Sequence, residues 1–214
     1  TAEAVANDYK VSREDQDLFS FNSHQKAVKA IQGGIFKDQI VPFSITETYL
    51  DAAEKKQTRT SIADTDEGAR MDTSIEKLAK LKPVFDAKGS VTAGNSSQTS
   101  DGAAFVLVVS EKMLKQLNVQ PRMRFVGYAV AGVEPRVMGI GPIKAIPAVL
   151  KQTGLTQNDI DLIELNEAFA SQSLAIIRTL GLNEDVVNVN GGAIALGHPL
   201  GCTGGKLTVQ IMNE

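Results

Sequence analysis

Short apolar segments alternate with helical segments in the second half of the chain, and this alternation restricts the possible folds more than any other feature. Residues 103–109 form an unbroken apolar run, which is typical of a strand covered on both faces. Further strands are predicted at residues 124–133, 162–165 and 186–189. Helices are predicted between the last three of these strands, with short connections, so the sequence indicates a layered α/β fold.

The helices are predicted from apolar periodicity and from stop residues. A capping box at residues 12–15 precedes an amphipathic helix that ends at Gly33-Gly34. The other predicted helices are residues 74–82 before Pro83, 143–153 before Gly154, 167–180 before Gly181, and a terminal helix after the last Gly-rich segment. A turn or short helix is expected at residues 156–159, and Pro147 is expected in the first turn of its helix.

The secondary structure of the segment between the first two predicted helices is less clearly indicated by the sequence. Residues 40–45 read as a short strand, and Pro42 assigns it to a sheet edge. Residues 46–72 are polar and poorly periodic, so they are predicted to be a surface loop. His24, on the first long helix, is expected to be solvated or at the boundary of the core.

Composition excludes several functional classes. The chain has 214 residues, 43% of them hydrophobic, and a net charge of −3, so it suits one large or two small globular domains and lacks a basic nucleic-acid footprint. No apolar run approaches the roughly 20 residues of a membrane span. One cysteine, Cys202, cannot form an internal disulfide and favours a reducing compartment. No histidine or cysteine spacing indicates a metal site.

A first candidate site lies where a predicted strand becomes a helix, at Asn166-Glu-Ala-Phe-Ala170. Polar groups at strand ends of α/β folds commonly face a ligand crevice. Two structural alternatives stay open: Asn166 as a helix cap, and Glu167 as a complement to the helix dipole.

A second candidate site is the Gly-rich segment at residues 188–205, which holds six glycines in eighteen residues. It also contains His198, which Pro199 biases towards an extended conformation. A histidine on a rigid turn is a good general base or hydrogen-bond donor. The alternative is a flexible loop, which the apolar residues 194–196 disfavour. P-loop and dinucleotide patterns fail, since neither completes its motif.

Together, Asn166-Glu-Ala-Phe-Ala170 and Asn190-Gly-Gly-Ala-Ile-Ala-Leu-Gly-His-Pro-Leu-Gly201 resemble the thiolase family (acetyl-CoA acetyltransferase and 3-ketoacyl-CoA thiolase). Residues 12–17, 66–70, 78–83 and 92–97 also resemble that family. The resemblance implies a layered α-β-α-β-α fold, incomplete in this chain. It implies a CoA-covering loop domain at residues 1–100, the end of an N-terminal core domain to about 120, and a C-terminal core domain at 121–214.

The implied activity is thiolysis of a 3-ketoacyl-CoA, or the reverse Claisen condensation, through an acyl-cysteine intermediate. The resemblance implies that His198 activates the nucleophilic thiol and helps bind the thioester oxygen, and that Asn166 orients a water in an oxyanion hole. It implies that Ser97 bonds the pantetheine arm and Arg70 packs on the adenine of CoA. The implied pocket lining is Phe85, Ala93, Gly94, Ala168 and Phe169. CoA and acyl-CoA are expected as substrates, with no tightly bound cofactor.

The family's two cysteines are expected outside these residues, and Cys202 matches neither, being small filler or a moderately reactive thiol. Because the chain opens at Thr1 and closes on a helical pattern without a stop, we expect a fragment that is inactive alone. A ketosynthase-type condensing enzyme and a noncatalytic CoA-binding relative are the alternatives, and Asn166 in place of a second histidine favours thiolase. A homodimer or homotetramer in the cytoplasm is expected from the resemblance, with an organelle matrix as the other compartment.

Overall fold

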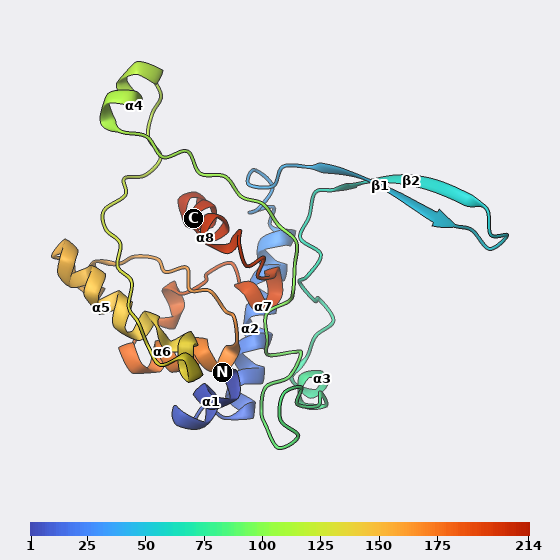
Figure 1. The fold of residues 1–214 in the computed structure, drawn as a ribbon, viewed down its shortest axis with the longest axis horizontal. Helices are drawn as coiled ribbons and strands as arrows, with labels where there is room; N and C mark the ends of the chain where they lie inside the picture. Colours follow the sequence, from blue (N-terminus) through green and yellow to red (C-terminus); the bar gives the residue numbers. More distant parts are fainter.

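A body of packed helices carries a single projecting β-hairpin in the computed structural model, which describes all residues from Thr1 to Glu214 (Figure 1). The α-helices are α1 (Ala2–Asp8), α2 (Arg13–Gln32), α3 (Ile75–Ala79), α4 (Glu111–Leu117), α5 (Pro142–Thr153), α6 (Ala170–Leu180), α7 (Ala193–Leu196) and α8 (Thr203–Asn213). Short 3-10 helices are η1 (Pro135–Ile140), η2 (Gln157–Asp159) and η3 (Glu184–Val186). No helix combines the length and apolar content needed to cross a bilayer.

The α2 helix begins as the sequence predicts. The Ser12 hydroxyl accepts a hydrogen bond from the Asp15 amide at 3.0 Å, which satisfies one of the free donors of the first turn. The helix ends at Gln32, with Gly33 as its cap. Its buried face carries small residues, including Ser23 and Ala27, so the loops that precede His198 can approach its backbone closely.

The α6 helix forms the centre of the body. All residues from 170 to 177 are buried, and α1, α2 and α5 pack around it. A helix buried on every side has to be surrounded by other elements. Gly181, in the left-handed conformation with φ +61°, ends it where predicted. The helix begins at Ala170 rather than at residue 167, so residues 166–169 form a loop.

The hairpin corrects two predictions. Its strands β1 (Phe43–Leu50) and β2 (Lys56–Ala63) pair antiparallel from Phe43 opposite Ala63 to Leu50 opposite Lys56. Residues 46–63 are therefore not a surface loop, and the first strand begins after Pro42. Both faces of the hairpin are largely solvent-exposed, and the alternation of Phe43, Ile45 and Tyr49 with polar residues in β1 is too short and interrupted to have marked it. Cross-strand pairs such as Arg59 and Glu47, 2.7 Å apart, hold it instead.

Two predicted strands are wrong for this chain. Residues 103–109 and 124–133 run extended, but no backbone hydrogen bond ties them to a neighbouring strand. A strand is defined by such a partner, and an apolar run cannot supply one by itself. The run is also not covered, since Phe105 is 91% exposed. The unpredicted α4, capped by the Ser110 hydroxyl, separates the two segments.

Smaller predictions have mixed outcomes. The predicted strands at 162–165 and 186–189 meet only in one parallel bridge, between Ile163 and Val187. The short helix predicted at 74–82 is confirmed as the shorter α3, and a capping box of Thr156 and Asp159 opens η2. Pro147 lies beyond the first turn of α5, inside the helix, which corrects the expectation for that residue.

Candidate active site

The loop that precedes α6 and the loop between α7 and α8 lie side by side and bring Asn166 and His198 together. The amide Nδ2 of Asn166 lies 3.3 Å from Nε2 of His198, although the residues are 32 positions apart in sequence. Asn166 comes from the loop that precedes α6, and His198 from the loop between α7 and α8. Both candidate segments found in the sequence therefore belong to one site.

Asn166 is not a helix cap. The cap of α6 is Phe169, three residues further on, so that interpretation is wrong. The Asn166 side chain instead directs its amide nitrogen at His198, and its buried Oδ1 has no hydrogen-bond partner. Buried polar atoms are usually paired, and exceptions are often functional. Asn166 is therefore placed for a role at the site.

Several contacts fix the position of His198. Its amide donates to the Gln98 carbonyl at 3.1 Å, and its Nδ1 lies 2.7 Å from the Thr203 hydroxyl. Gly197, at φ +89°, permits the turn, and a Cβ there would collide with Ser100. Partial burial and the nearby Lys206 cation lower the pKa of His198. The imidazole is thus neutral and able to accept a proton at neutral pH.

Glu167 joins the two loops, and its expected role at the helix dipole is wrong. Its buried carboxylate accepts hydrogen bonds from the Ser23 hydroxyl at 2.7 Å, Asn188 Nδ2 at 2.9 Å and the Ile194 amide at 3.2 Å. The Ser23 hydroxyl in turn accepts from the Gly192 amide at 3.1 Å, so its own proton is free to bond Glu167. Burial raises the pKa of Glu167, and these donors oppose that shift.

We expect Glu167→Gln to lower the free energy of unfolding of the full-length protein by about 1–3 kcal/mol, because it sets a new amide donor against buried donors. Urea unfolding measures the loss. The matched control is Glu184→Gln, which makes the same change at an exposed position. A Glu167→Gln loss as small as that of the control would contradict a role for the carboxylate in joining the loops.

Most of the residues that the resemblance assigns to CoA lie together. Residues 95–97 run beside residues 168–170, with the Ser97 amide donating to the Ala168 carbonyl at 3.0 Å and a bridge between Ser96 and Phe169. The rings of Phe85 and Phe169 meet edge to face, with centroids 6.1 Å apart. Ala93 and Gly94 precede this segment, and a Cβ on Gly94 would lie 2.6 Å from side-chain carbons of Leu78 and Leu81.

Gln98 links these residues to the loop of His198, and the sequence analysis missed it. Its backbone carbonyl accepts from His198, while its side-chain amide donates to the carbonyls of Gly68, Ile194 and Ala195 at 2.9, 3.1 and 3.2 Å. A glutamine within a run of small polar residues carries no local signal for this role. Only its tertiary contacts identify it.

Arg70 is exposed and lies outside the group around Ser97. Its side chain forms no ion pair, and its backbone amide donates to Nδ1 of His24 at 3.1 Å. His24 is 4% exposed, so the expectation that it is solvated is wrong. Burial, together with the Arg70 cation, lowers the pKa of His24 to about 4.

We expect acid to destabilise the protein partly through His24. Because the pKa of His24 is about 4 in the folded state and about 6.5 in the unfolded state, its contribution is complete above pH 6.5 and is lost as the pH falls towards 4. The loss is roughly 2 kcal/mol at pH 5. Thermal melts at pH 7 and pH 5 should show a smaller difference for His24→Gln than for wild type. Equal differences in both proteins would contradict this account.

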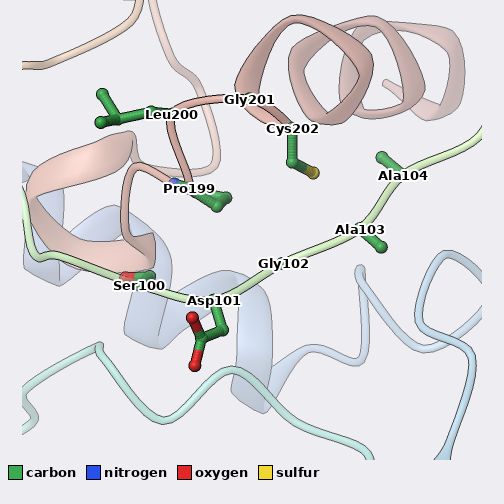
Figure 2. A pocket seen from close by; sticks show the side chains of 9 residues that line it. All are labelled: Ser100, Asp101, Gly102, Ala103, Ala104, Pro199, Leu200, Gly201 and Cys202. Atoms are coloured by element: carbon green, nitrogen blue, oxygen red, sulfur yellow. The ribbon is translucent and has the colours of Figure 1, made fainter.

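An open depression of about 420 Å³ lies next to the site, between residues 100–104 and residues 199–202 (Figure 2). Cys202 lines it and is the first residue before α8, as expected for a thiol near a helix start. None of the residues predicted for catalysis or CoA binding lines this depression. No hydrogen bond joins Cys202 to His198, so the depression borders the His198 pair without containing it.

A neutral imidazole facing an amide donor is chemically suited to proton transfer and to stabilising a negative oxygen. Two family models match the chain: "Thiolase, N-terminal domain" at residues 1–112 and "Thiolase, C-terminal domain" at residues 119–214. The chain belongs to the thiolase family.

Known thiolases are similar to this chain, in sequence and in structure, along its whole length. The 3-ketoacyl-CoA thiolase of Bacillus subtilis (strain 168) is 54% identical over 214 residues, which are 100% of this chain and 55% of that protein. The structure of the Bacillus anthracis acetyl-CoA acetyltransferase matches with a TM-score of 0.92 at 45% identity, over 99% of this chain and 52% of that one.

Two further solved structures bear on ligand and assembly. Human mitochondrial 3-ketoacyl-CoA thiolase in complex with CoA matches with a TM-score of 0.87 and 42% identity, over 100% of this chain and 51% of that one. The dimeric peroxisomal thiolase of Saccharomyces cerevisiae matches with a TM-score of 0.89 and 45% identity, over 99% and 51%. The chain spans about half the length of these relatives. The α/β thiolase fold class is confirmed.

Proposed function

We propose that the full-length protein is an acyl-CoA C-acyltransferase that cleaves 3-ketoacyl-CoA with free CoA, or condenses acetyl-CoA in the reverse direction. The observation that carries the proposal is the pair of His198 Nε2 and Asn166 Nδ2 at 3.3 Å, in a chain of the thiolase family. Family membership indicates acyl-CoA substrates. The His198–Asn166 pair offers a base and a hydrogen-bond donor, which the acyl transfer needs.

In the proposed reaction, a cysteine thiolate attacks the 3-keto carbon and forms a thioester. The electron pair of the broken carbon–carbon bond leaves with acetyl-CoA, which takes up a proton. The thiolate of a second CoA then attacks the acyl-enzyme and releases the cysteine thiolate. His198 accepts the thiol proton, and it helps Asn166 hold the negative oxygen of each tetrahedral intermediate. Cys202 is not assigned as the nucleophile, since it makes no hydrogen bond to the imidazole.

For CoA itself, Ser97 is proposed to bond the pantetheine arm and Arg70 to pack on the adenine. The pairing of residues 95–97 with 168–170 supports a common surface for Ser97, Ala168, Phe169 and Phe85, with Ala93 and Gly94 beside it. The exposed guanidinium of Arg70 is free to stack on a flat ring. These assignments, and the division into domains at about residue 120, are predictions.

The test is to incubate the purified full-length protein with acetoacetyl-CoA and CoA, to follow turnover, and to search for an acetylated cysteine by mass spectrometry. Turnover with an acylated cysteine supports the proposal. CoA binding without turnover would favour the noncatalytic alternative. Condensation that requires a substrate on a carrier protein would favour a ketosynthase-type enzyme, against which Asn166 at the place of a second histidine argues.

For assembly, we propose a homodimer, as the yeast relative is described, with a tetramer as the second candidate. Analytical ultracentrifugation of the full-length protein distinguishes the two. The proposed compartment is the cytoplasm, with an organelle matrix as the alternative, because relatives include a mitochondrial and a peroxisomal thiolase. Microscopy of the tagged protein in its source cell decides between them.

A further inference from the structure

Thr203, the first residue of α8, lies on the side of His198 away from Asn166. Its hydroxyl is 2.7 Å from His198 Nδ1 and donates to the Pro199 carbonyl at 3.0 Å. Thr203 is 6% exposed, so water does not replace these bonds. A continuous line of hydrogen bonds thus runs from Asn166 through the imidazole to the turn that begins α8.

Asn166 determines which groups donate and which accept in this series of hydrogen bonds. Its Nδ2 carries only hydrogens, so the neighbouring Nε2 of His198 must accept. A neutral imidazole has a single ring proton, which therefore lies on Nδ1 and is donated to the Thr203 oxygen. The reverse direction would place two donors against each other at Nε2.

The turn itself holds Thr203 in position. The Pro199 carbonyl accepts from the backbone amides of Cys202 at 2.8 Å and Thr203 at 2.9 Å, as well as from the Thr203 hydroxyl. The acceptor is therefore fixed by the same backbone that carries His198. While it donates to this carbonyl, the Thr203 hydroxyl presents its oxygen rather than its proton to the imidazole.

We propose that Thr203 is a positioning residue that, together with Asn166, holds His198 in the tautomer with the proton on Nδ1, so that Nε2 keeps the lone pair that accepts from Asn166 and can take up a thiol proton in its place. It acts through the imidazole and touches neither substrate nor cysteine. The benefit for catalysis rests on the proposed function, whereas the tautomer is a property of the folded protein and can be measured without turnover.

The experiment compares the wild-type full-length protein with Thr203→Val, which keeps the shape and removes the hydroxyl, and with Thr203→Ser, which restores it. Thr208→Val is the matched control, because the Thr208 hydroxyl makes the same bond to the carbonyl four residues earlier, Gly204, but on the exposed side of α8. Nitrogen NMR of labelled histidine identifies the protonated ring nitrogen of His198, with His198→Gln for assignment. Steady-state assays use acetoacetyl-CoA and CoA.

We expect the proton on Nδ1 in wild type, in Thr203→Ser and in Thr208→Val. In Thr203→Val the Nδ1 proton has no acceptor, so the share of His198 with the proton on Nδ1 should fall even though Asn166 still donates to Nε2. We expect a loss of about 10- to 100-fold in kcat with KM for CoA little changed, the range found when the hydrogen-bond partner of a metal-bound imidazole is removed. A wild-type protein with the proton on Nε2 overturns the proposal, whether or not Thr203→Val folds. So does a folded Thr203→Val protein with the wild-type tautomer. A wild type with the Nδ1 proton but no thiolase turnover would instead count against the proposed function alone.

Discussion

His198→Ala in the full-length protein is expected to lower kcat for thiolysis by on the order of 10²–10⁴-fold, while CoA affinity changes little. In the proposed reaction, His198 takes up the thiol proton and supports a developing negative oxygen, and both interactions grow towards the transition state. Ser97, Phe85 and Phe169, which are proposed to contact CoA, keep their own contacts when the imidazole is removed. Steady-state kinetics and CoA titration measure the two effects separately.

The control for this experiment is Cys202→Ala. Cys202 lies in the same loop but makes no hydrogen bond to His198, so its removal should leave kcat within about threefold of wild type. A His198→Ala protein within the same threefold range would remove His198 from the mechanism. Loss of the acyl-enzyme in Cys202→Ala would instead show that Cys202 is the nucleophile.

Asn166→Asp is expected to lower kcat by roughly a hundredfold or more, with a melting temperature near that of wild type. An ionised aspartate has only acceptors, so it cannot donate to an oxyanion water or to Nε2 of His198. Its negative charge beside the imidazole would also favour the protonated ring and so remove the base. The fold should tolerate the change, because Phe169 rather than Asn166 caps α6.

Asn158→Asp provides the matched control, since it makes the same substitution at an exposed position in η2. It should leave both kcat and the melting temperature unchanged. An Asn166→Asp enzyme that melts and turns over like wild type would leave the catalytic assignment without support. Melting curves and initial rates on the same protein samples separate a catalytic from a structural effect.

The predictions that held rest on local chemistry. Ser12 begins α2, Gly154 and Gly181 end α5 and α6, and Thr156 with Asp159 opens η2. Each signal needs only residues within a few positions, because a cap bonds the adjacent turn and a glycine supplies the left-handed conformation directly. The two motifs that resemble thiolases are similarly local, and they carried the family assignment.

The strand predictions failed where a partner decides the structure. Residues 103–109 have the apolar composition of a buried strand, yet Phe105 is exposed because nothing in the chain pairs with or covers that segment. The exposed β1–β2 hairpin was missed for the opposite reason: its strands are largely polar and pair without burying either face. Backbone pairing is a contact between distant segments, and periodicity reports only which faces are buried.

The sequence by itself determined the longer helices α2, α5 and α6 to within a few residues, several turns, and His198 and Asn166 as candidates, since these depend on residue type and short spacing. Only the tertiary structure decided that the two side chains face each other, that buried Glu167 ties their loops to α2 through Ser23, and that Thr203 bonds the far side of the imidazole. The physical reason is distance along the chain. Asn166 and His198 are 32 positions apart, and Ser23 and Glu167 are 144 apart, so packing around α6 alone brings them within hydrogen-bonding range.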